Sequence, residues 1–236
     1  MVQYMYGQRT QASYGGMEAL ISQLLPVASR KSFKKHAILL YQGEAPRTAF
    51  VLLKGTVKVY SINGAGEEQV VDFHSQHDVF PASWLFGKAS TTLYYYEALT
   101  DCEVLTVARD QLQQILIANP LCVHHMLDYY ATSYVSTLMR VTALEQSRAR
   151  EKIMFTLYYL LFRYGREVRP GIFVVGLSLT HAVIASLVGL TRETTTTELS
   201  KLRREGVVTY RSHTYTVSKP KLERLLGEDS FQNLII

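Results

Sequence analysis

The sequence predicts an α+β fold in which a jelly roll of short strands is followed by a long central helix and a winged helix-turn-helix. From His36 to about Val107, short alternating or apolar segments are separated by glycines and polar turns. From Leu121 to about Gly165, the pattern is helical and almost unbroken. Around Gly189, two short helical segments precede two alternating strands. A chain of 236 residues is long enough for two domains with separate cores.

The composition is that of a folded protein, with 47% hydrophobic and 19% charged residues. The sequence has no run of eighteen apolar residues, so we expect no membrane span and no membrane partner. No apolar core follows Met1 to Arg9, so a signal peptide is not predicted and a cytoplasmic location is expected. Cys102 and Cys122 lack metal-type spacing, which favours reduced, structural cysteines.

The elements divide the chain into four segments. Residues 1–32 are predicted to form an N-terminal arm and short helix, and residues 33–120 the jelly roll. The jelly roll ends in a short helix from Asp110 to Leu116, which Asn119-Pro120 terminates. Residues 121–147 form the long helix, and residues 148–236 the winged helix-turn-helix domain.

The long helix carries a narrow apolar seam at spacings of three, four or seven residues. Such a seam commonly buries against an identical helix, which predicts a dimer interface formed by Leu127, Tyr130, Tyr134, Val141 and Leu144. The alternative is a core helix lying against the jelly roll. A break near Glu145 to Arg148 would be the hinge to the C-terminal domain, although the charged run that follows also suits an ordinary solvated helix face.

The helix-turn-helix pattern begins with an apolar helix face. This face consists of Val183, Ile184, Leu187 and Val188. Gly189 suits the left-handed end of that helix, and Thr191 suits the N-cap of the next. Leu199 and Leu202 would lie inside, whereas the outer side would present Arg192, Glu193, Thr196, Thr197 and Lys201. Because residues 194–197 are all threonine, packing rather than propensity must hold this helix.

A β-hairpin wing and a basic balance favour DNA binding over an ordinary helical hairpin with a solvated face. The segments 207–210 and 215–217 alternate around a polar turn at 211–214. From Leu177 to Leu225 there are eight Lys or Arg against four Asp or Glu, or +4 of the total +5. Such a surface suits phosphate contact, with the second helix in the major groove.

Several motifs resemble the CRP/FNR family of bacterial transcription regulators. The C-terminal motifs are residues 187–194, Leu-Val-Gly-Leu-Thr-Arg-Glu-Thr, and 199–208, Leu-Ser-Lys-Leu-Arg-Arg-Glu-Gly-Val-Val. In the N-terminal half, residues 42–44, 49–60 and 64–73 resemble the family's β-roll sensor domain. The likeness runs from about Phe33 to Leu225. It implies a homodimer whose β-roll signal shifts the long helices and thereby the spacing of the two recognition helices.

The family's Arg-Glu-Thr-Val-Ser/Gly-Arg pattern is partly retained. The resemblance implies base contacts by Arg192, toward guanine O6 and N7, and by Glu193, toward a cytosine amine, together with Thr196 and Thr197. Thr197 replaces the family's last arginine, so the guanine preference at that position should be lost or altered. Contacts to the DNA backbone are expected from Thr180, Thr191, Lys201, Arg203, Arg204 and Arg211.

The cyclic AMP signature of the family is absent. Members that bind cyclic AMP carry Gly-Glu and then Arg-Ser or Arg-Thr, which supply backbone N–H groups, a ribose acceptor and a phosphate partner. Here Pro81, which has no N–H, stands in the place of the glycine, and Ala82 stands in that of the glutamate. There is no arginine between Gly87 and Asp101. We therefore do not expect cyclic AMP to bind.

The sequence does not predict the other cofactors of the family either. An iron–sulfur cluster needs about four thiolate-type ligands, which two distant cysteines cannot supply. Haem would need only one or two axial ligands, for which His74, His77 or Cys102 could serve. Lone histidines near a strand are more often surface or hydrogen-bonded residues, so haem is not predicted. No metal or other cofactor is predicted.

Aromatic residues gather in and beside the segment that would form the effector pocket. Walls of this kind suit an apolar, planar or peptide-like ligand. The alternative is that the rings fill a pocket that has lost its ligand. The candidate effector pocket consists of Phe80, Trp84, Tyr94, Tyr95, Tyr96 and Tyr134, with Phe86 nearby.

The sequence therefore predicts a regulator that binds a pseudo-palindromic double-stranded DNA site as a homodimer. An unidentified small-molecule effector would control it, or it would be constitutively active, and RNA polymerase is a further candidate partner. No nucleophile–base pair or phosphate loop suggests an enzyme, and the adjacent His124 and His125 are not spaced for one helix face. The alternative is a ligand-sensing protein-interaction module with a degenerate DNA-binding domain. Whether it activates or represses is open.

Overall fold

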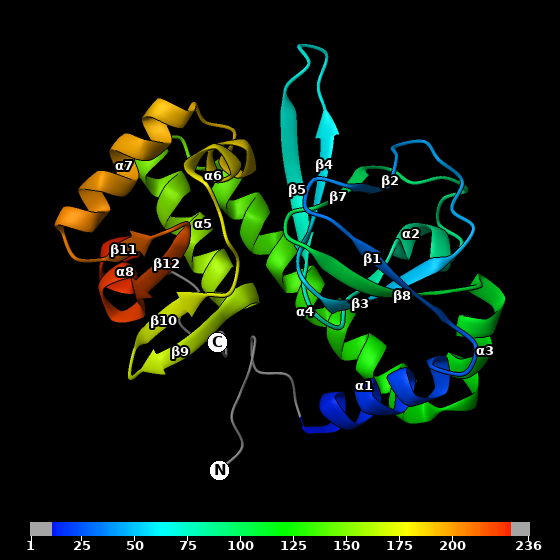
Figure 1. Cartoon of the computed structure of the whole chain (residues 1–236). Coiled ribbons are helices and arrows are strands. Elements are labelled where there is room, and N and C mark those ends of the chain that lie inside the picture. Colours follow the sequence, from blue (N-terminus) through cyan, green and yellow to red (C-terminus); the bar gives the residue numbers. More distant parts are fainter. Residues whose placement is uncertain (1–10, 228–236) are drawn as a thin grey trace. The chain divides into compact units, whose positions relative to one another are not determined.

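The computed structural model describes residues 11–227, with side chains from Met17 onward (Figure 1). Within this range the chain forms two compact units, Gln11–Tyr129 and a second unit from Tyr130 onward. The parts of the predicted N-terminal arm and C-terminal domain at residues 1–10 and 228–236 lie outside the described residues.

The first unit contains two antiparallel four-stranded sheets, with strand orders β1-β8-β3-β6 and β2-β7-β4-β5. This arrangement confirms the predicted jelly roll, and short helices precede, interrupt and follow the strands. In chain order the elements are α1 Gln11–Leu24, β1 Ser29–Phe33, β2 Ile38–Leu40, β3 Ala49–Lys54, β4 Val57–Ile62, β5 Glu68–His74, β6 Val79–Phe80, α2 Ala82–Leu85, β7 Tyr95–Ala98, β8 Cys102–Val107 and α3 Arg109–Ala118.

Apolar side chains from both sheets form the core of the first unit. The alternation of strand residues sends one side of each strand inward, so Val57 and Val59 of β4 are buried with Leu52 of β3 and Val104 of β8. The tight turn between β3 and β4 requires Gly55, whose φ is +96°. A Cβ at that position would lie 2.4 Å from the carbonyl oxygen of Asp101, closer than real Cβ atoms approach.

Two helices, α4 and α5, follow the β-roll. The first, α4, runs over Pro120–Glu145 and starts with the proline, whose missing N–H costs nothing in a first helical turn. The second, α5, runs over Ala149–Tyr164, so the chain breaks its helix at residues 146–148, as predicted. The Lys152 ammonium donates to the carbonyl oxygen of Leu144 at 2.9 Å and thereby satisfies one of the last carbonyls of α4.

The second unit adds a four-stranded sheet of order β11-β12-β10-β9 to its helices. The predicted wing strands are confirmed, whereas β9 and β10, a hairpin directly after α5, were not anticipated from the sequence. The elements are β9 Gly165–Arg169, β10 Ile172–Val175, α6 His181–Val188, α7 Arg192–Arg204, β11 Val208–Arg211, β12 Thr214–Ser218 and α8 Lys219–Leu226.

The largest fully buried side chains of the second unit are tyrosines. Tyr158, Tyr159 and Tyr164 of α5 and Tyr215 of β12 are essentially inaccessible to solvent. The Tyr158 hydroxyl donates to the Glu223 carboxylate of α8 at 2.8 Å, so this burial leaves the hydroxyl satisfied. Among the helices described between residues 11 and 227, none combines the length and the apolarity needed to cross a membrane.

Candidate nucleic-acid interface

Local capping chemistry defines the helix-turn-helix. The Thr180 hydroxyl accepts the N–H of Val183 at 3.2 Å and begins α6. Gly189 ends α6 in the left-handed conformation, with φ 67° and ψ 39°. The Thr191 hydroxyl then accepts the N–H of Thr194 at 3.1 Å and begins α7. The predicted roles of Gly189 and Thr191 are confirmed, and Thr180 is a second N-cap.

The buried faces of α6 and α7 hold the two helices together. Ile184, Leu187 and Val188 of α6 are buried, while Val183 is half-buried. Leu199 and Leu202 of α7 are fully buried, as predicted. Thr195 is buried on the same side of α7, which explains how one member of the unfavourable threonine run is retained in a helix.

The opposite side of α7 is open to solvent. Arg192, Glu193, Thr197 and Lys201 are all exposed there. Thr196 differs, because it is half-buried and its hydroxyl lies 2.9 Å from Nδ1 of His181 on α6. The exposed side therefore combines one guanidinium, one carboxylate and one hydroxyl that can reach a base edge, together with a lysine farther along.

The remaining cationic candidates differ in how free their charges are. Lys201 pairs with Glu198 at 2.7 Å, so part of its charge is already compensated. The Arg203 guanidinium lies 5.1 Å from the centre of the Tyr210 ring, a cation–π contact. Arg204 and Arg211 are exposed. The structure thus leaves these two the most open of the predicted phosphate contacts.

The hydroxyl of Thr191 is already engaged on both sides. It accepts the N–H of Thr194 and donates its proton to the Thr194 hydroxyl at 2.9 Å. A phosphate at the start of α7 would therefore have to bind backbone N–H groups of the first turn rather than the Thr191 proton.

The wing closes one side of this surface. Its turn passes through Ser212 and His213, both with positive φ, as a two-residue hairpin turn requires. A hollow of about 500 Å³ lies between the wing and the first residues of α6 and α7. It is lined by Thr180, His181, Ala182, Arg192, Tyr210, Ser212, His213 and Tyr215.

The aromatic residues predicted for the effector pocket are not brought together into one wall. The Phe80 ring is fully buried beside two nearly parallel rings, with its centroid 4.7 Å from that of His74 and 5.4 Å from that of Tyr96. Tyr95 instead stacks on Tyr60 at 5.2 Å, because successive strand residues point to opposite faces.

The other members of that set lie apart from this stack. Trp84 is buried, with the Arg109 guanidinium 5.6 Å from its ring centre. Tyr94 is partly buried and packs against the β-roll core. Tyr134 lies on α4 and is 66% exposed. In this segment, then, rings mostly fill the interior of the β-roll.

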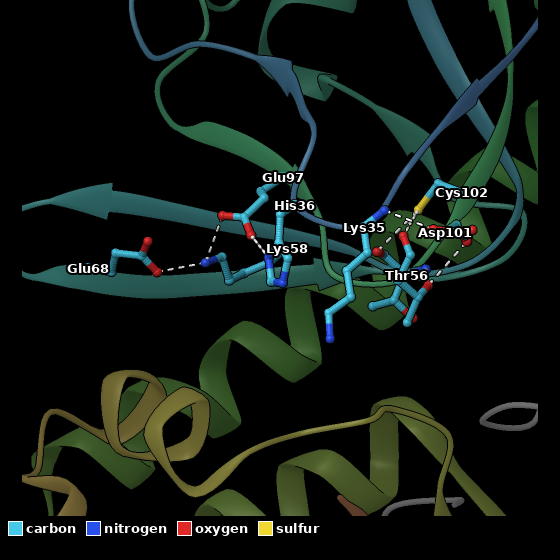
Figure 2. A network of polar contacts seen from close by, with 9 residues as sticks. Lys35, His36, Thr56, Lys58, Glu68, Glu97, Asp101 and Cys102 are labelled. Atoms are coloured by element: carbon cyan, nitrogen blue, oxygen red, sulfur yellow. Dashed lines mark hydrogen bonds and ion pairs between the residues drawn. The ribbon is translucent and has the colours of Figure 1, made fainter.

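A polar cluster on the β-roll was missed by sequence reasoning (Figure 2). The ammonium of Lys58, whose side chain is 7% exposed, lies 2.6 Å from Glu68 and 3.0 Å from Glu97. His36 Nδ1 lies 3.0 Å from the second Glu97 oxygen. Burial alone would raise the pKa of Glu97, but the hydrogen bonds from His36 and Lys58 lower it below its usual value.

This polar cluster also changes the environment of the neighbouring Tyr60. The Lys58 ammonium lies 4.2 Å from the centre of the Tyr60 ring. Burial, followed by the negative charges of Glu97 and Glu68, raises the pKa of Tyr60 to about 12. Lys58 and Glu97 are cross-strand partners of β4 and β7, but they are 39 positions apart in the chain, so no local pattern announces the pair.

Most of the predicted dimer seam of α4 is exposed in the part of the chain that the structure describes. Leu127 and Tyr134 are 64% and 66% exposed, and Val141 and Leu144 are also exposed, whereas Tyr130 is half-buried. Leu138, which the prediction omitted, is exposed as well. A helix with this many exposed large apolar side chains is unusual unless another surface covers it.

Two family models match the two halves of the chain. The cyclic nucleotide-binding domain matches residues 30–119, and the Crp-like helix-turn-helix domain matches residues 151–225. The global nitrogen regulator of Nostoc sp. is 29% identical over 191 residues, or 80% of this chain and 85% of that protein. The regulatory protein HlyX of Actinobacillus pleuropneumoniae is 24% identical, covering 82% and 79% of the two chains.

Solved structures share the fold. FixK2 from Bradyrhizobium japonicum superposes with a TM-score of 0.69 at 20% identity, covering 86% of this chain and 100% of that one. A CRP/FNR family transcriptional regulator from Thermus thermophilus gives 0.62 at 24% identity, covering 84% and 98%. Both domain models match in the order typical of one family, and the relatives are regulators that share it. The chain therefore belongs to the CRP/FNR family of transcription regulators.

Proposed function

We propose that this DNA-binding transcription regulator acts as a homodimer that reads a pseudo-palindromic site with α7 in the major groove. The observation that carries the proposal is the exposed side of α7, where Arg192, Glu193 and Thr197 stand together at the start of a helix capped by Thr191. Their side chains are the types that discriminate base edges.

Base readout is divided among these side chains by their chemistry. Arg192 can donate two parallel hydrogen bonds to guanine O6 and N7, and Glu193 can accept one from a cytosine amine. Thr197 can make one hydrogen bond or contact a thymine methyl group. Arg204 and Arg211, with Lys201 and Arg203, are proposed to hold phosphates and so to set position rather than sequence.

Dimerisation through α4 supplies the two-fold symmetry that a palindrome needs. Leu138→Glu should convert the dimer to a monomer in analytical ultracentrifugation, because it places a charge in the exposed apolar stripe. Ile117→Glu, which places the same charge at an exposed apolar position of α3 outside this stripe, is the matched control and should leave the dimer intact. A dimer that survives Leu138→Glu would argue for another interface.

We propose that DNA binding needs no cyclic nucleotide. The support is the chemistry of residues 78–87: Pro81 has no N–H to offer a phosphate, and Ala82 has no oxygen for a ribose. The buried stack of Phe80, His74 and Tyr96 also fills space within the β-roll. Cyclic AMP should therefore leave the thermal unfolding midpoint unchanged, whereas a bound ligand would raise it.

The first test is in vitro selection of genomic DNA fragments by the purified full chain with no ligand added. An enriched palindrome would establish sequence-specific binding without an obligatory effector. Arg192→Ala should then weaken binding by about 1–3 kcal/mol and relax one base position. Equal losses on every sequence would contradict base readout by Arg192.

No enrichment, with or without added metabolite extracts, would favour the alternative of a protein-interaction module with a degenerate DNA-binding domain. Control of transcription would further require contact with RNA polymerase, and the cytoplasm is where a regulator of this bacterial kind meets its DNA.

A further inference from the structure

His181 occupies a junction of three elements next to the proposed reading surface. It is the first residue of α6, and its Nδ1 lies 2.9 Å from the Thr196 hydroxyl of α7. Its ring meets Tyr210 of β11 edge-on at 5.0 Å between centroids and lies 6.4 Å from Tyr215 of β12. The half-buried imidazole is therefore held by packing while one nitrogen faces a recognition-helix hydroxyl.

The surroundings of His181 favour its neutral form. Burial lowers the pKa of His181, and the positive charge of Arg192 on α7 and the nearby His213 in the wing turn lower it further. Of the tyrosines that flank the ring, Tyr215 has a pKa raised by burial and stays uncharged. At neutral pH, then, Nδ1 belongs to an imidazole that carries a single ring proton.

A hydroxyl has one proton, so a bond on one side determines what it can do on the other. If Nδ1 accepts the Thr196 proton, the outward side of that hydroxyl offers only lone pairs. If His181 becomes imidazolium, Nδ1 must donate, and the Thr196 proton turns outward. The same side chain would then recognise opposite partners in the two protonation states.

We infer that His181 is a positioning residue that sets the hydrogen-bond polarity of Thr196 and thereby the base that Thr196 reads. The inference rests on the proposed entry of α7 into the major groove. With His181 neutral and its proton on Nε2, Thr196 presents an acceptor, which suits the amines of adenine or cytosine. With His181 protonated, Thr196 presents a donor, which suits guanine O6 and N7 or thymine O4.

The test is in vitro selection by the full chain at pH 7.5 and pH 5.5, followed by affinity measurements on sites that differ at one base pair. For the wild-type chain, the preference at the position facing Thr196 should move from adenine or cytosine toward guanine or thymine as the pH falls. A single net hydrogen bond corresponds to a change of roughly two- to tenfold.

Variants of His181 separate polarity from structure. His181→Asn places an oxygen near the Nδ1 position but does not titrate, so it should keep the pH 7.5 preference at both pH values. His181→Phe fills the same space without a hydrogen bond, so it should lose the preference at this one position and keep overall binding. Equal base preferences for wild type and His181→Phe would overturn the inference.

Three further variants give decisive results. Thr196→Ala should abolish the pH-dependent preference, whereas Thr197→Ala should alter a different base position and leave that dependence intact. His213→Asn, which removes the neighbouring titratable ring at a left-handed position that asparagine tolerates, should leave the shift unchanged. Loss of the shift in His213→Asn would assign it to the wing and overturn our inference. A wild-type chain that enriches no site at either pH, with or without added metabolite extracts, would refute the proposed function and this inference with it.

Discussion

Gly189 allows the conformational cost of the helix-turn-helix bend to be isolated. Its φ is +67°, in the region that side chains rarely adopt, and a Cβ added there would meet nothing within 4 Å. Gly171, in the β9–β10 hairpin of the same compact unit, has a similar φ of +72°. A Cβ there would lie 2.9 Å from Cγ of Pro220, in a stiff ring. The two alanine substitutions therefore differ mainly by one steric contact.

The expected changes in the free energy of unfolding follow from the left-handed backbone conformation and from the contact with Pro220. A left-handed alanine costs about 1–2 kcal/mol, and the loss of glycine's freedom in the unfolded chain returns about 0.4–1 kcal/mol. Gly189→Ala should therefore lower the free energy of unfolding by roughly 1 kcal/mol. Gly171→Ala should cost about 1–3 kcal/mol more, because overpacking against Pro220 is added. Gly189→Asn should cost less than Gly189→Ala, since asparagine enters the left-handed region more readily.

The assay is urea unfolding at one fixed protein concentration, since dimerisation makes the midpoint depend on concentration. Far-ultraviolet circular dichroism follows the helices, and the three variants are compared with the parent chain. If Gly189→Ala destabilises the protein as much as Gly171→Ala, the conclusion that a Cβ at Gly189 meets no neighbouring atom is wrong. If Gly189→Asn lowers the free energy of unfolding more than Gly189→Ala does, the left-handed conformation of Gly189 is wrong.

Three other predictions concern the capping and charges of α7. Thr191→Ala removes the N-cap and should lower the free energy of unfolding by about 1 kcal/mol, measurable by the same urea series. Hydrogen bonds from Arg150 lower the pKa of Glu205. At this exposed pair they contribute below about 1 kcal/mol to the free energy of unfolding. That contribution is present above about pH 4.3 and is lost as the pH falls through the lowered pKa. Glu205→Gln should therefore be less stable than wild type at pH 7, and the difference should shrink as the pH falls through that lowered pKa; a constant difference would refute the linkage. Arg204→Ala should reduce the slope of log affinity against log salt by about 1, and Lys201→Ala by less, because Glu198 already compensates Lys201.

Elements determined by local chemistry could be predicted from the sequence. The bend at Gly189 and the cap at Thr191 depend on the conformational freedom of one residue and the hydroxyl of another. The buried side of α7 follows from the spacing of Leu199 and Leu202. The wing follows from alternation around a polar turn, where Ser212 and His213 take positive φ.

Features that depend on long-range pairing could not be predicted. The Lys58–Glu97 pair arises only once β4 and β7 are in register, and the His181–Thr196 bond only once α6 crosses α7. The sequence pattern did not predict the β9–β10 hairpin, because the hairpin directly follows a long helical pattern that ends at Tyr164. Likewise, Tyr95 and Tyr96 read as one aromatic group, although a strand sends neighbours to opposite faces.

The contacts of Arg140 have a consequence for dividing the protein into fragments. Its guanidinium donates to the carbonyl oxygen of Leu187, in the last turn of α6, at 3.0 Å, and lies 6.0 Å from the centre of the Tyr159 ring. A fragment cut at the helix break and beginning at Ala149 would lose this arginine and leave the end of α6 without that donor. The smallest autonomous DNA-binding fragment should therefore begin near Tyr130, where the second compact unit starts, and carry more than half of the long helix with it.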